Sequence, residues 1–343
     1  MDGKNSQKNS QESISMDHGL DNSANKFKSI LEDFIIVRDH NFKLSDVAGL
    51  QDAKKVLKEA LLKETRISWN GVLLYGPPGT GKTYLAKAIA SEAPSSTFFS
   101  VSSSDLVSTW LSMSQQLMMH LFEMARAQKP SIVFIDDVDL LCSEKLNTEN
   151  VRRLKSEFIS QMQNSGIGQG DGVLVLAATN NPWSLDSDLL GCFQKRIHIS
   201  LPDEYARRAM FRLHLQNTTH YYSEENISSF AVKTQGYTGA DIILVVRDAL
   251  MQPVRNVQSS THFKKIKSPK CCSDSFVPCC ANDAEAIKMT WLQISNEQLV
   301  VPPVTMDDMI KSIDKTKPSI TQTYLEKIIQ FSKDFGQEDE LRK

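Results

Sequence analysis

Short runs of apolar residues alternate with amphipathic stretches along the middle of the chain. The runs are rich in Val, Ile, Leu and Phe and end at turn residues, which is typical of strands buried on both faces. They predict strands at residues 71–76, 97–102, 131–136, 172–180 and 196–202. Because helical stretches separate them, we expect βαβ units and a parallel five-stranded sheet between helices, an α/β fold.

Helical periodicity extends on both sides of these strands. Residues 51–64 are rich in strong helix formers, and residues 26–39 space their apolar side chains as a short amphipathic helix does. After Pro202 the same periodicity predicts helices at residues 204–216, 223–234, 239–258 and 321–336.

These patterns divide the chain into consecutive segments. A polar linker, expected to be disordered at its start, precedes a large α/β domain. A small helical subdomain follows, with a polar, Cys-rich β insertion at about 262–303, and a C-terminal helix and tail complete the chain. The expected boundaries are 1–40, 41–202, 203–320 and 321–343.

Composition narrows the classes of protein. The chain has 343 residues, 41% of them hydrophobic, which is enough for one large or two smaller cores. A formal net charge of −2 gives no case for binding nucleic acid or an anionic membrane. No apolar run approaches the roughly 18–20 residues that cross a bilayer, and the N-terminus carries no secretory or lipidation signal. We therefore expect a soluble, cytoplasmic protein.

Four of the six cysteines cluster in CCSDSFVPCC, as Cys271, Cys272, Cys279 and Cys280. Paired cysteines suggest zinc, but this spacing is not a common ligand pattern and adjacent cysteines chelate one ion awkwardly. Free thiols in a surface loop are the favoured interpretation and zinc is the alternative. A disulfide is less expected than either, because cytosolic thiols stay reduced.

The segment YGPPGTGKT (75–83) carries the clearest chemical signal. It lies between a predicted strand and the helix-forming YLAKAIASEA, and it matches G-x-x-x-x-G-K-[ST]. Its glycines let backbone N–H groups surround phosphate, and the helix N-terminus adds positive potential. Lys82 can neutralise the β- and γ-phosphates, and the Thr83 hydroxyl can bind Mg²⁺. The alternative is a glycine-rich turn without a ligand. The residues expected to contact nucleotide here are Gly76, Pro77, Pro78, Gly79, Thr80, Gly81, Lys82, Thr83 and Tyr84.

Polar side chains also follow two other predicted strands. Asp136, at the end of SIVFID, should hold Mg²⁺ through water, although a simple strand-capping acid is the alternative. Asp137 should orient the attacking water, a role that usually falls to Glu. Asn180 can place an amide near the γ-phosphate, or it can serve a turn in Asn-Asn-Pro. Together with the phosphate loop, these residues predict a P-loop NTPase, with Asp137, Asn180 and Lys82 as its catalytic residues.

A series of segments then resembles one family, the meiotic-clade AAA ATPases. In chain order they are SDVAGL, GPPGTGKT, FFSVSSSDLVS, KPSIVFID, AATNNPW, GYTGADI and VRDALMQPVRNVQSSTHFKK, followed by MTWLQI and FSKDFGQ. The resemblance runs from about Phe42 to Gly336. It implies ATP and Mg²⁺ as cofactors and a hexameric ring of identical or related subunits. It further implies that the ring pulls ESCRT-III polypeptides through a central pore, in endosomal and multivesicular body sorting, and reaches membranes only through partners.

The resemblance also implies roles at matching positions. It makes Asp136 the Walker B aspartate and Asn180 sensor 1. It places the adenine pocket at Asp46, Val47, Ala48 and Gly49, and the sensor 2 region at Gly239, Ala240 and Asp241. It places the aromatic pore loop at Trp110 and Leu111. A packed core residue is the alternative interpretation of Trp110.

Two departures from the family bear on catalysis. Asp137 stands in place of the catalytic Glu, and the shorter side chain displaces the carboxylate by about 1 Å, which can cost about 10²-fold in rate. The family has consecutive arginines that enter the neighbouring subunit's ATP site, where this chain has Leu190, Gly191 and Cys192. Such a residue is worth about 10³–10⁵ in rate. We do not expect Lys195 or Arg196, beyond Phe193, to substitute for it.

Other departures concern assembly and substrate. Thr109 replaces a Lys before Trp110, the turn at 112–116 is altered, and the segment 61–71 is shorter than in the family. The first 40 residues are too short for the family's three-helix MIT domain, which we expect to be absent. Three hypotheses remain: an ATPase with attenuated or partner-dependent hydrolysis, a nucleotide-binding pseudo-ATPase that regulates a full-length relative in mixed rings, and a drifting duplicate.

Overall fold

The structure is a computed structural model. It describes residues 35–36, 42–61, 69–93, 96–108, 113–143, 149–164, 172–216, 222–267, 274–295 and 297–337. The chain forms two compact units. The first comprises Met1–Pro77, Gly81–Ser200 and Thr323–Lys343, and the second comprises Pro78–Thr80 and Leu201–Gln322. The C-terminal helix thus belongs with the α/β part of the chain, although helices of the other unit precede it.

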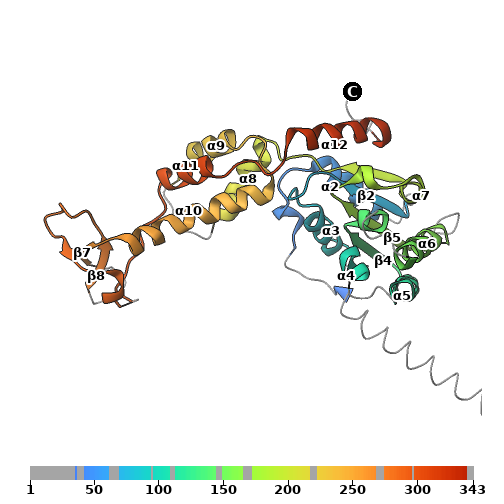
Figure 1. Cartoon of the computed structure of the whole chain (residues 1–343), viewed down its shortest axis with the longest axis horizontal. Coiled ribbons are helices and arrows are strands. Elements are labelled where there is room, and N and C mark those ends of the chain that lie inside the picture. The colour runs from blue at the N-terminus through green and yellow to red at the C-terminus, as the bar shows by residue number, and fades with distance from the viewer. Residues whose placement is uncertain are drawn as a thin grey trace, which may run out of the picture. The chain divides into compact units, whose positions relative to one another are not determined.

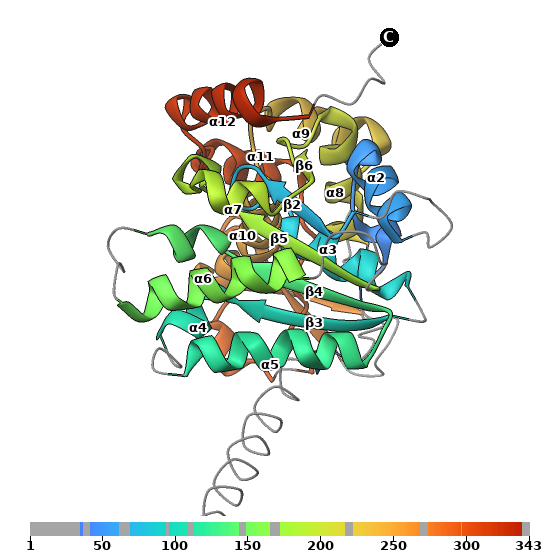
Figure 2. The ribbon, with the colours of Figure 1, turned by 90° about the vertical axis from the view of Figure 1, so that its right-hand side faces the viewer.

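The first unit is built on a six-stranded sheet of order β1-β3-β4-β5-β2-β6 (Figure 2). Its parallel strands are β2 (Gly71–Tyr75), β3 (Thr97–Ser102), β4 (Ser131–Asp136), β5 (Val173–Thr179) and β6 (Lys195–His198). They confirm the predicted parallel five-stranded sheet. Its central strands β4, β5 and β2 are buried almost throughout, which explains why they read as continuous apolar runs.

One prediction at the edge of this sheet is wrong. Ile35 and Ile36, within the helix predicted at 26–39, form β1 (Ile35–Ile36) and pair antiparallel with Phe99 and Phe98 of β3. Pairing with an exposed sheet edge suits β-branched residues and prevails here over helical spacing. The other residues of that predicted helix lie outside the described residues.

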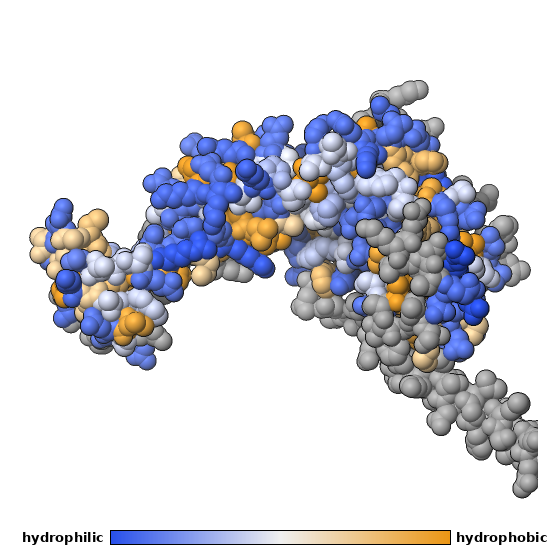
Figure 3. Space-filling model, viewed as in Figure 1, coloured by the Kyte–Doolittle hydropathy of each residue, from blue (hydrophilic) through white to orange (hydrophobic). Residues whose placement is uncertain are grey.

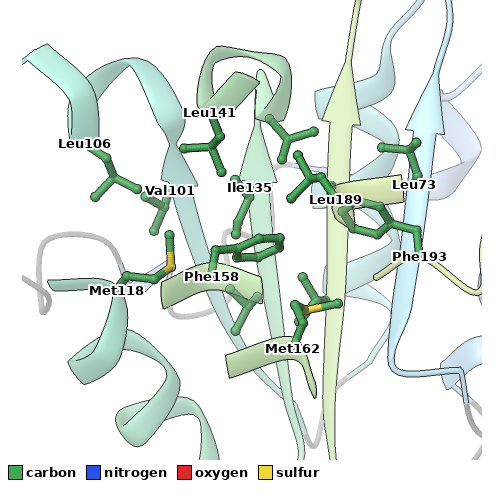
Figure 4. Packing of buried hydrophobic residues seen from close by; sticks show 14 of the residues in the cluster. Leu73, Val101, Leu106, Met118, Ile135, Leu141, Phe158, Met162, Leu189 and Phe193 are labelled. Atoms are coloured by element: carbon green, nitrogen blue, oxygen red, sulfur yellow. The ribbon is translucent and has the colours of Figure 1, made fainter. Parts of the chain in front are cut away.

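Helices cover both faces of the sheet (Figures 1 and 2). On β2, Val72 and Leu74 enter the apolar cluster that includes residues of α2 and α3, whereas Leu73 and Tyr75 enter the cluster with α5 and α6. In Figure 4, Phe158 of α6 lies beside Ile135 of β4 in the second of these clusters. The helices of this unit are α2 (Gln51–Leu61), α3 (Lys82–Ser91), α4 (Ser103–Ser108), α5 (Ser114–Ala127), α6 (Glu149–Asn164), α7 (Ser187–Gly191) and α12 (Gln322–Phe335), with the 3-10 helices η1 (Leu44–Asp46), η2 (Val138–Cys142) and η4 (Pro182–Ser184).

The second unit is helical and carries a small sheet. Its helices α8 (Glu204–Leu215), α9 (Glu224–Lys233), α10 (Gly239–Ser259) and α11 (Met306–Lys315) share one apolar core. The strands β7 (His262–Lys267), β8 (Asp274–Pro278) and β9 (Ile287–Lys288) form an antiparallel sheet of order β8-β7-β9, followed by the 3-10 helix η5 (Trp291–Gln293). These elements confirm the predicted helical subdomain with a β insertion.

The sequence interpretation missed α11. The helix is short, but Thr305 caps it, and the Thr305 and Asp308 side chains each accept from the other residue's backbone N–H. This capping box was the available signal.

No helix in the described part of the chain is both long enough and apolar enough to cross a membrane.

Candidate active site

The phosphate loop has the backbone that phosphate binding requires. At Gly76 a Cβ atom would lie 2.1 Å from the Ile199 carbonyl oxygen, so no larger residue fits without moving that backbone. Gly81 precedes α3 with a φ of +89°, in the left-handed region where glycine carries no Cβ penalty. The loop therefore turns directly into the N-terminus of α3, a favourable place for an anion.

Lys82 is the first residue of α3 and is only 6% exposed. Its Nζ donates to the carbonyl oxygens of Gly76 at 2.9 Å and Pro77 at 2.8 Å. Burial lowers the pKa of Lys82 to about 8, against the opposing effect of nearby carboxylates, of which Asp136 is the strongest. The ammonium group is thus held inside the loop by weak neutral acceptors, which phosphate oxygens can replace.

Thr83 and Asp136 lie together, as the sequence predicts. The Thr83 hydroxyl donates to Asp136 Oδ2 at 2.7 Å, so the first turn of α3 meets the end of β4. A hydroxyl beside a carboxylate is an oxygen donor set that suits Mg²⁺. Within the described residues no cluster of three or more His, Cys, Asp or Glu side chains forms a metal site. Thr83 and Asp136 offer oxygen atoms from two side chains, so an ion held here would take its remaining ligands from water and phosphate.

Asp137 has an unusual backbone, with a φ of +52° and a ψ of +46°. Asp and Asn are enriched several-fold among the non-glycine residues in this left-handed region. Asn180 Nδ2 donates to Asp137 Oδ1 at 3.2 Å, so the two predicted catalytic residues are in contact. Burial raises the pKa of Asp137, the Asp136 and Asp139 carboxylates raise it further, and Lys82 opposes them.

A buried polar network that the sequence interpretation missed fixes the strand ends below Asp137. Asp139 accepts from the Thr179 hydroxyl at 2.7 Å and from Asn181 Nδ2 at 3.1 Å. Asp139 is 9% exposed and Thr179 is fully buried. The network ties η2, after β4, to the end of β5. The signal was the third acid in DDVD, since a buried Asp requires partners.

The segment predicted to line the adenine pocket lies beside the start of α3. Burial raises the pKa of the Tyr84 phenol, and the Asp46 carboxylate, to which the phenol donates, raises it further. Val47 is 9% exposed, and its carbonyl oxygen accepts from Lys54 Nζ. Asp46 and Val47 thus lie near Tyr84, two residues beyond Lys82.

The predicted sensor 2 residues lie at the start of α10. The Ala240 N–H donates to the Gly79 carbonyl oxygen at 3.2 Å, within the second unit. A Cβ atom on Gly239 would also lie 3.2 Å from that oxygen. Asp241 instead caps its own helix by accepting from the Thr238 N–H at 2.9 Å.

The positions where the family carries arginines hold no cation. Leu190 is 5% exposed and packs in the core, Gly191 is exposed at the end of α7, and Cys192 is a half-buried free thiol. Arg196 donates to the carbonyl oxygens of Leu190 at 3.0 Å and Phe335 at 3.1 Å, so its guanidinium is engaged within its own unit. The predicted pore loop, Trp110 and Leu111, lies outside the described residues.

The predicted cysteine cluster is described only in part. Cys279 and Cys280 are free thiols after β8, whereas Cys271 and Cys272 lie outside the described residues.

A parallel sheet with a phosphate loop after β2, carboxylates after β4 and an amide after β5, joined to a helical unit, defines a P-loop ATPase of the AAA class. The family models agree. The ATPase family associated with various cellular activities (AAA) matches residues 72–201, the AAA+ lid domain 224–268, and the Vps4 C terminal oligomerisation domain 276–336.

Proteins of similar sequence show which family of AAA ATPases the chain belongs to. Vacuolar protein sorting-associated protein 4B of Mus musculus is 49% identical, over 91% of this chain and 74% of its own length. Vacuolar protein sorting-associated protein 4 of Dictyostelium discoideum is 44% identical, over 94% of this chain and 76% of its own. The crystal structure of the FIGL-1 AAA domain in complex with ADP matches with a TM-score of 0.73 and 30% identity, over 91% of this chain and 97% of its own. The chain belongs to the vacuolar protein sorting-associated protein 4 family of AAA ATPases.

Proposed function

We propose that this protein binds MgATP and hydrolyses it weakly, with full turnover depending on a neighbouring subunit that supplies an arginine. Its role would be that of the ATPases that disassemble ESCRT-III polymers in the cytoplasm, at endosomes. One observation carries the proposal: the residues that act on the chain's own nucleotide lie within hydrogen-bond distance of one another, whereas positions 190–192 offer a neighbour no cation.

The chain's own residues divide the work on ATP. Lys82 exchanges its two carbonyl acceptors for phosphate oxygens and neutralises their charge. Thr83 and Asp136 would hold Mg²⁺, which when bound supplies positive charge to the β- and γ-phosphates. Asp137 accepts a hydrogen bond from the attacking water, and Asn180 fixes the direction of that carboxylate through its 3.2 Å hydrogen bond.

Two features attenuate the reaction. The Asp137 carboxylate is one methylene short of the Glu position, a displacement that can cost about 10²-fold, although its raised pKa makes it a stronger base. The missing arginine is worth more, about 10³–10⁵. Because it would act in the adjacent subunit's site, a ring made only of this chain lacks it at every interface.

The same asymmetry supports a second function, that of a regulatory subunit in mixed rings. A normal neighbour could donate arginines to this chain's nucleotide, but this chain could not return them. Such a subunit would bind ATP and lower the activity of the ring that it enters.

Features of the C-terminal part of the chain support assembly. The match to an oligomerisation domain covers residues 276–336, and apolar side chains are exposed on the β insertion and in the loop after it (Figure 3). Leu292 is 75% exposed, Val301 46% and Ile287 44%. We propose a hexamer, of this chain or with related subunits, in which Trp110 and Leu111 grip a polypeptide such as an ESCRT-III subunit.

The decisive experiment is ATP turnover by the purified protein, alone and mixed with vacuolar protein sorting-associated protein 4B. Weak turnover that Lys82→Ala removes, and that rises with the relative, supports the ATPase. Nucleotide binding without turnover, together with inhibition of the relative at substoichiometric ratios, supports the regulatory subunit. Turnover equal to Lys82→Ala, with no co-assembly on gel filtration in ATP, contradicts both.

A further inference from the structure

We propose that Tyr324 is a positioning residue for the hydrolysis of ATP, and that it acts through Asn180. The inference rests on the proposed function. Tyr324 lies in the first turn of α12, so the C-terminal helix would contribute a residue to the active site.

The phenol of Tyr324 meets two strands where they end. Its hydroxyl donates to the Asn180 carbonyl oxygen and lies 3.4 Å from the Gly76 carbonyl oxygen. Strands β5 and β2 are neighbours, with Thr179 opposite Tyr75, so Asn180 and Gly76 are the first residues beyond a matched pair. One hydroxyl therefore contacts the backbone both at sensor 1 and at the start of the phosphate loop.

Asn180 connects this hydroxyl to the reacting groups. The Tyr324 hydroxyl holds the Asn180 main chain, and the Asn180 side chain holds Asp137 Oδ1 at 3.2 Å. The Gly76 carbonyl oxygen also accepts from Lys82 Nζ at 2.9 Å. When Lys82 turns to phosphate, that oxygen loses its closer donor, and the Tyr324 hydroxyl remains beside it.

The surroundings of Tyr324 keep the phenol in place and protonated. Its ring packs edge-on against Trp183, with centroids 5.2 Å apart, and Lys327 covers the Trp183 ring. Further along α12, Ile328 and Phe331 are buried in the core of the first unit. Burial, aided by Asp139, raises the pKa of Tyr324 to about 12, so the hydroxyl is a donor throughout the physiological range.

The test is Tyr324→Phe, which removes the hydroxyl and keeps the ring. We expect kcat to fall about 5- to 10-fold with KM changed less than about 2-fold, since one neutral hydrogen bond is lost. Ser332→Ala is the matched control. It removes the 3.0 Å hydrogen bond that the same helix makes with the Tyr75 hydroxyl and should leave kcat within about 2-fold.

A double variant separates positioning from mere docking of α12. If Tyr324 acts through Asn180, adding Tyr324→Phe to Asn180→Ala should lower kcat no further, because the amide that it orients is gone. A purely structural role would lower kcat equally in both backgrounds, or equally in Ser332→Ala, and either result overturns the inference.

If the wild-type protein binds ATP without turnover, the proposed hydrolysis is contradicted, but the role of Tyr324 can still be tested by nucleotide binding. The ratio of the Kd for ADP to the Kd for ATPγS then replaces kcat, because the site beside Asp137 and Asn180 receives the γ-phosphate. Tyr324→Phe should lower that ratio about 3- to 5-fold, as the loss of one hydrogen bond predicts. An unchanged ratio overturns the inference.

Discussion

Replacing Gly191 by Arg should restore much of the hydrolysis that a homomeric ring lacks. Gly191 is the last residue of α7 and is exposed. A Cβ atom there meets no heavy atom of the described residues within 4 Å, beyond its own helix and chain neighbours. A long side chain can therefore be added without displacing the core.

The effect on folding should be small and favourable. Replacing a helical glycine gains roughly 0.5–1 kcal/mol, and a cation in the last turn of a helix gains about 0.3–1 kcal/mol. The adjacent Leu190 offers the contrast. It is 5% exposed, so an arginine there buries an unpaired charge and should lower the free energy of unfolding by about 3 kcal/mol or more.

The expected gain in turnover follows from the missing charge. One arginine in the neighbour's site is worth about 10³–10⁵, and the lower end applies because position 190 remains Leu. The variant still has Asp137 in place of the longer Glu, so its turnover should remain about 10²-fold below that of the family. Gly191→Arg should therefore raise steady-state turnover about 10³-fold at concentrations at which the protein assembles.

Gly191→Met is the matched control, since it adds similar length without charge. Coupled-enzyme turnover of the wild type, Gly191→Arg and Gly191→Met should be compared against Lys82→Ala, with assembly checked by light scattering. The reasoning is refuted if assembled Gly191→Arg turns over no faster than Gly191→Met.

Three further predictions follow from individual side chains. Burial lowers the pKa of Lys82 in the free protein to about 8, and the deprotonated amine must regain a proton to bind phosphate. Nucleotide affinity should therefore be constant below pH 8 and fall about tenfold per pH unit above it. A Kd that is flat from pH 8 to about 9.5 contradicts this prediction. Arg196→Met removes two charge-assisted hydrogen bonds and should lower the free energy of unfolding, measured in urea, by about 2 kcal/mol. Arg153 is exposed, so Arg153→Met should change that free energy by less than about 0.5 kcal/mol. Equal losses in the two variants would contradict a stabilising role for the Arg196 hydrogen bonds. Burial raises the pKa of the Cys192 thiol to about 11, so iodoacetamide at about pH 8 should alkylate it far more slowly than the exposed Cys280, as mass spectrometry can measure.

Much of the fold was predictable because its determinants are local. The parallel strands are continuous apolar runs, and the helices after Pro202 have clear periodicity. β1 was not predictable from local sequence, because Ile35 and Ile36 form a strand only by pairing with the edge of β3, which is distant in sequence.

The site was predictable where residue type and spacing define the chemistry. The phosphate loop, Thr83 and Asp136 come together because the ends of parallel strands share one edge of the sheet. Tyr324 and the Asp139 network were not predictable, since their contacts join segments far apart in the chain. The positive φ of Asp137 was equally hidden, because it arises from the turn into η2.

That backbone changes how the Asp at position 137 is understood. From the sequence, Asp in place of Glu is only a loss of length. In the structure, position 137 is left-handed, where a short side chain that bonds to nearby polar groups is tolerated best, and Asn180 already holds its carboxylate. The chain therefore keeps an oriented acid at position 137, whereas position 190 holds a buried leucine and position 191 a glycine. Under the proposed function, the loss falls on positions that would serve an adjacent subunit, and a mixed ring could supply the missing arginine from a relative whereas a homomeric ring could not.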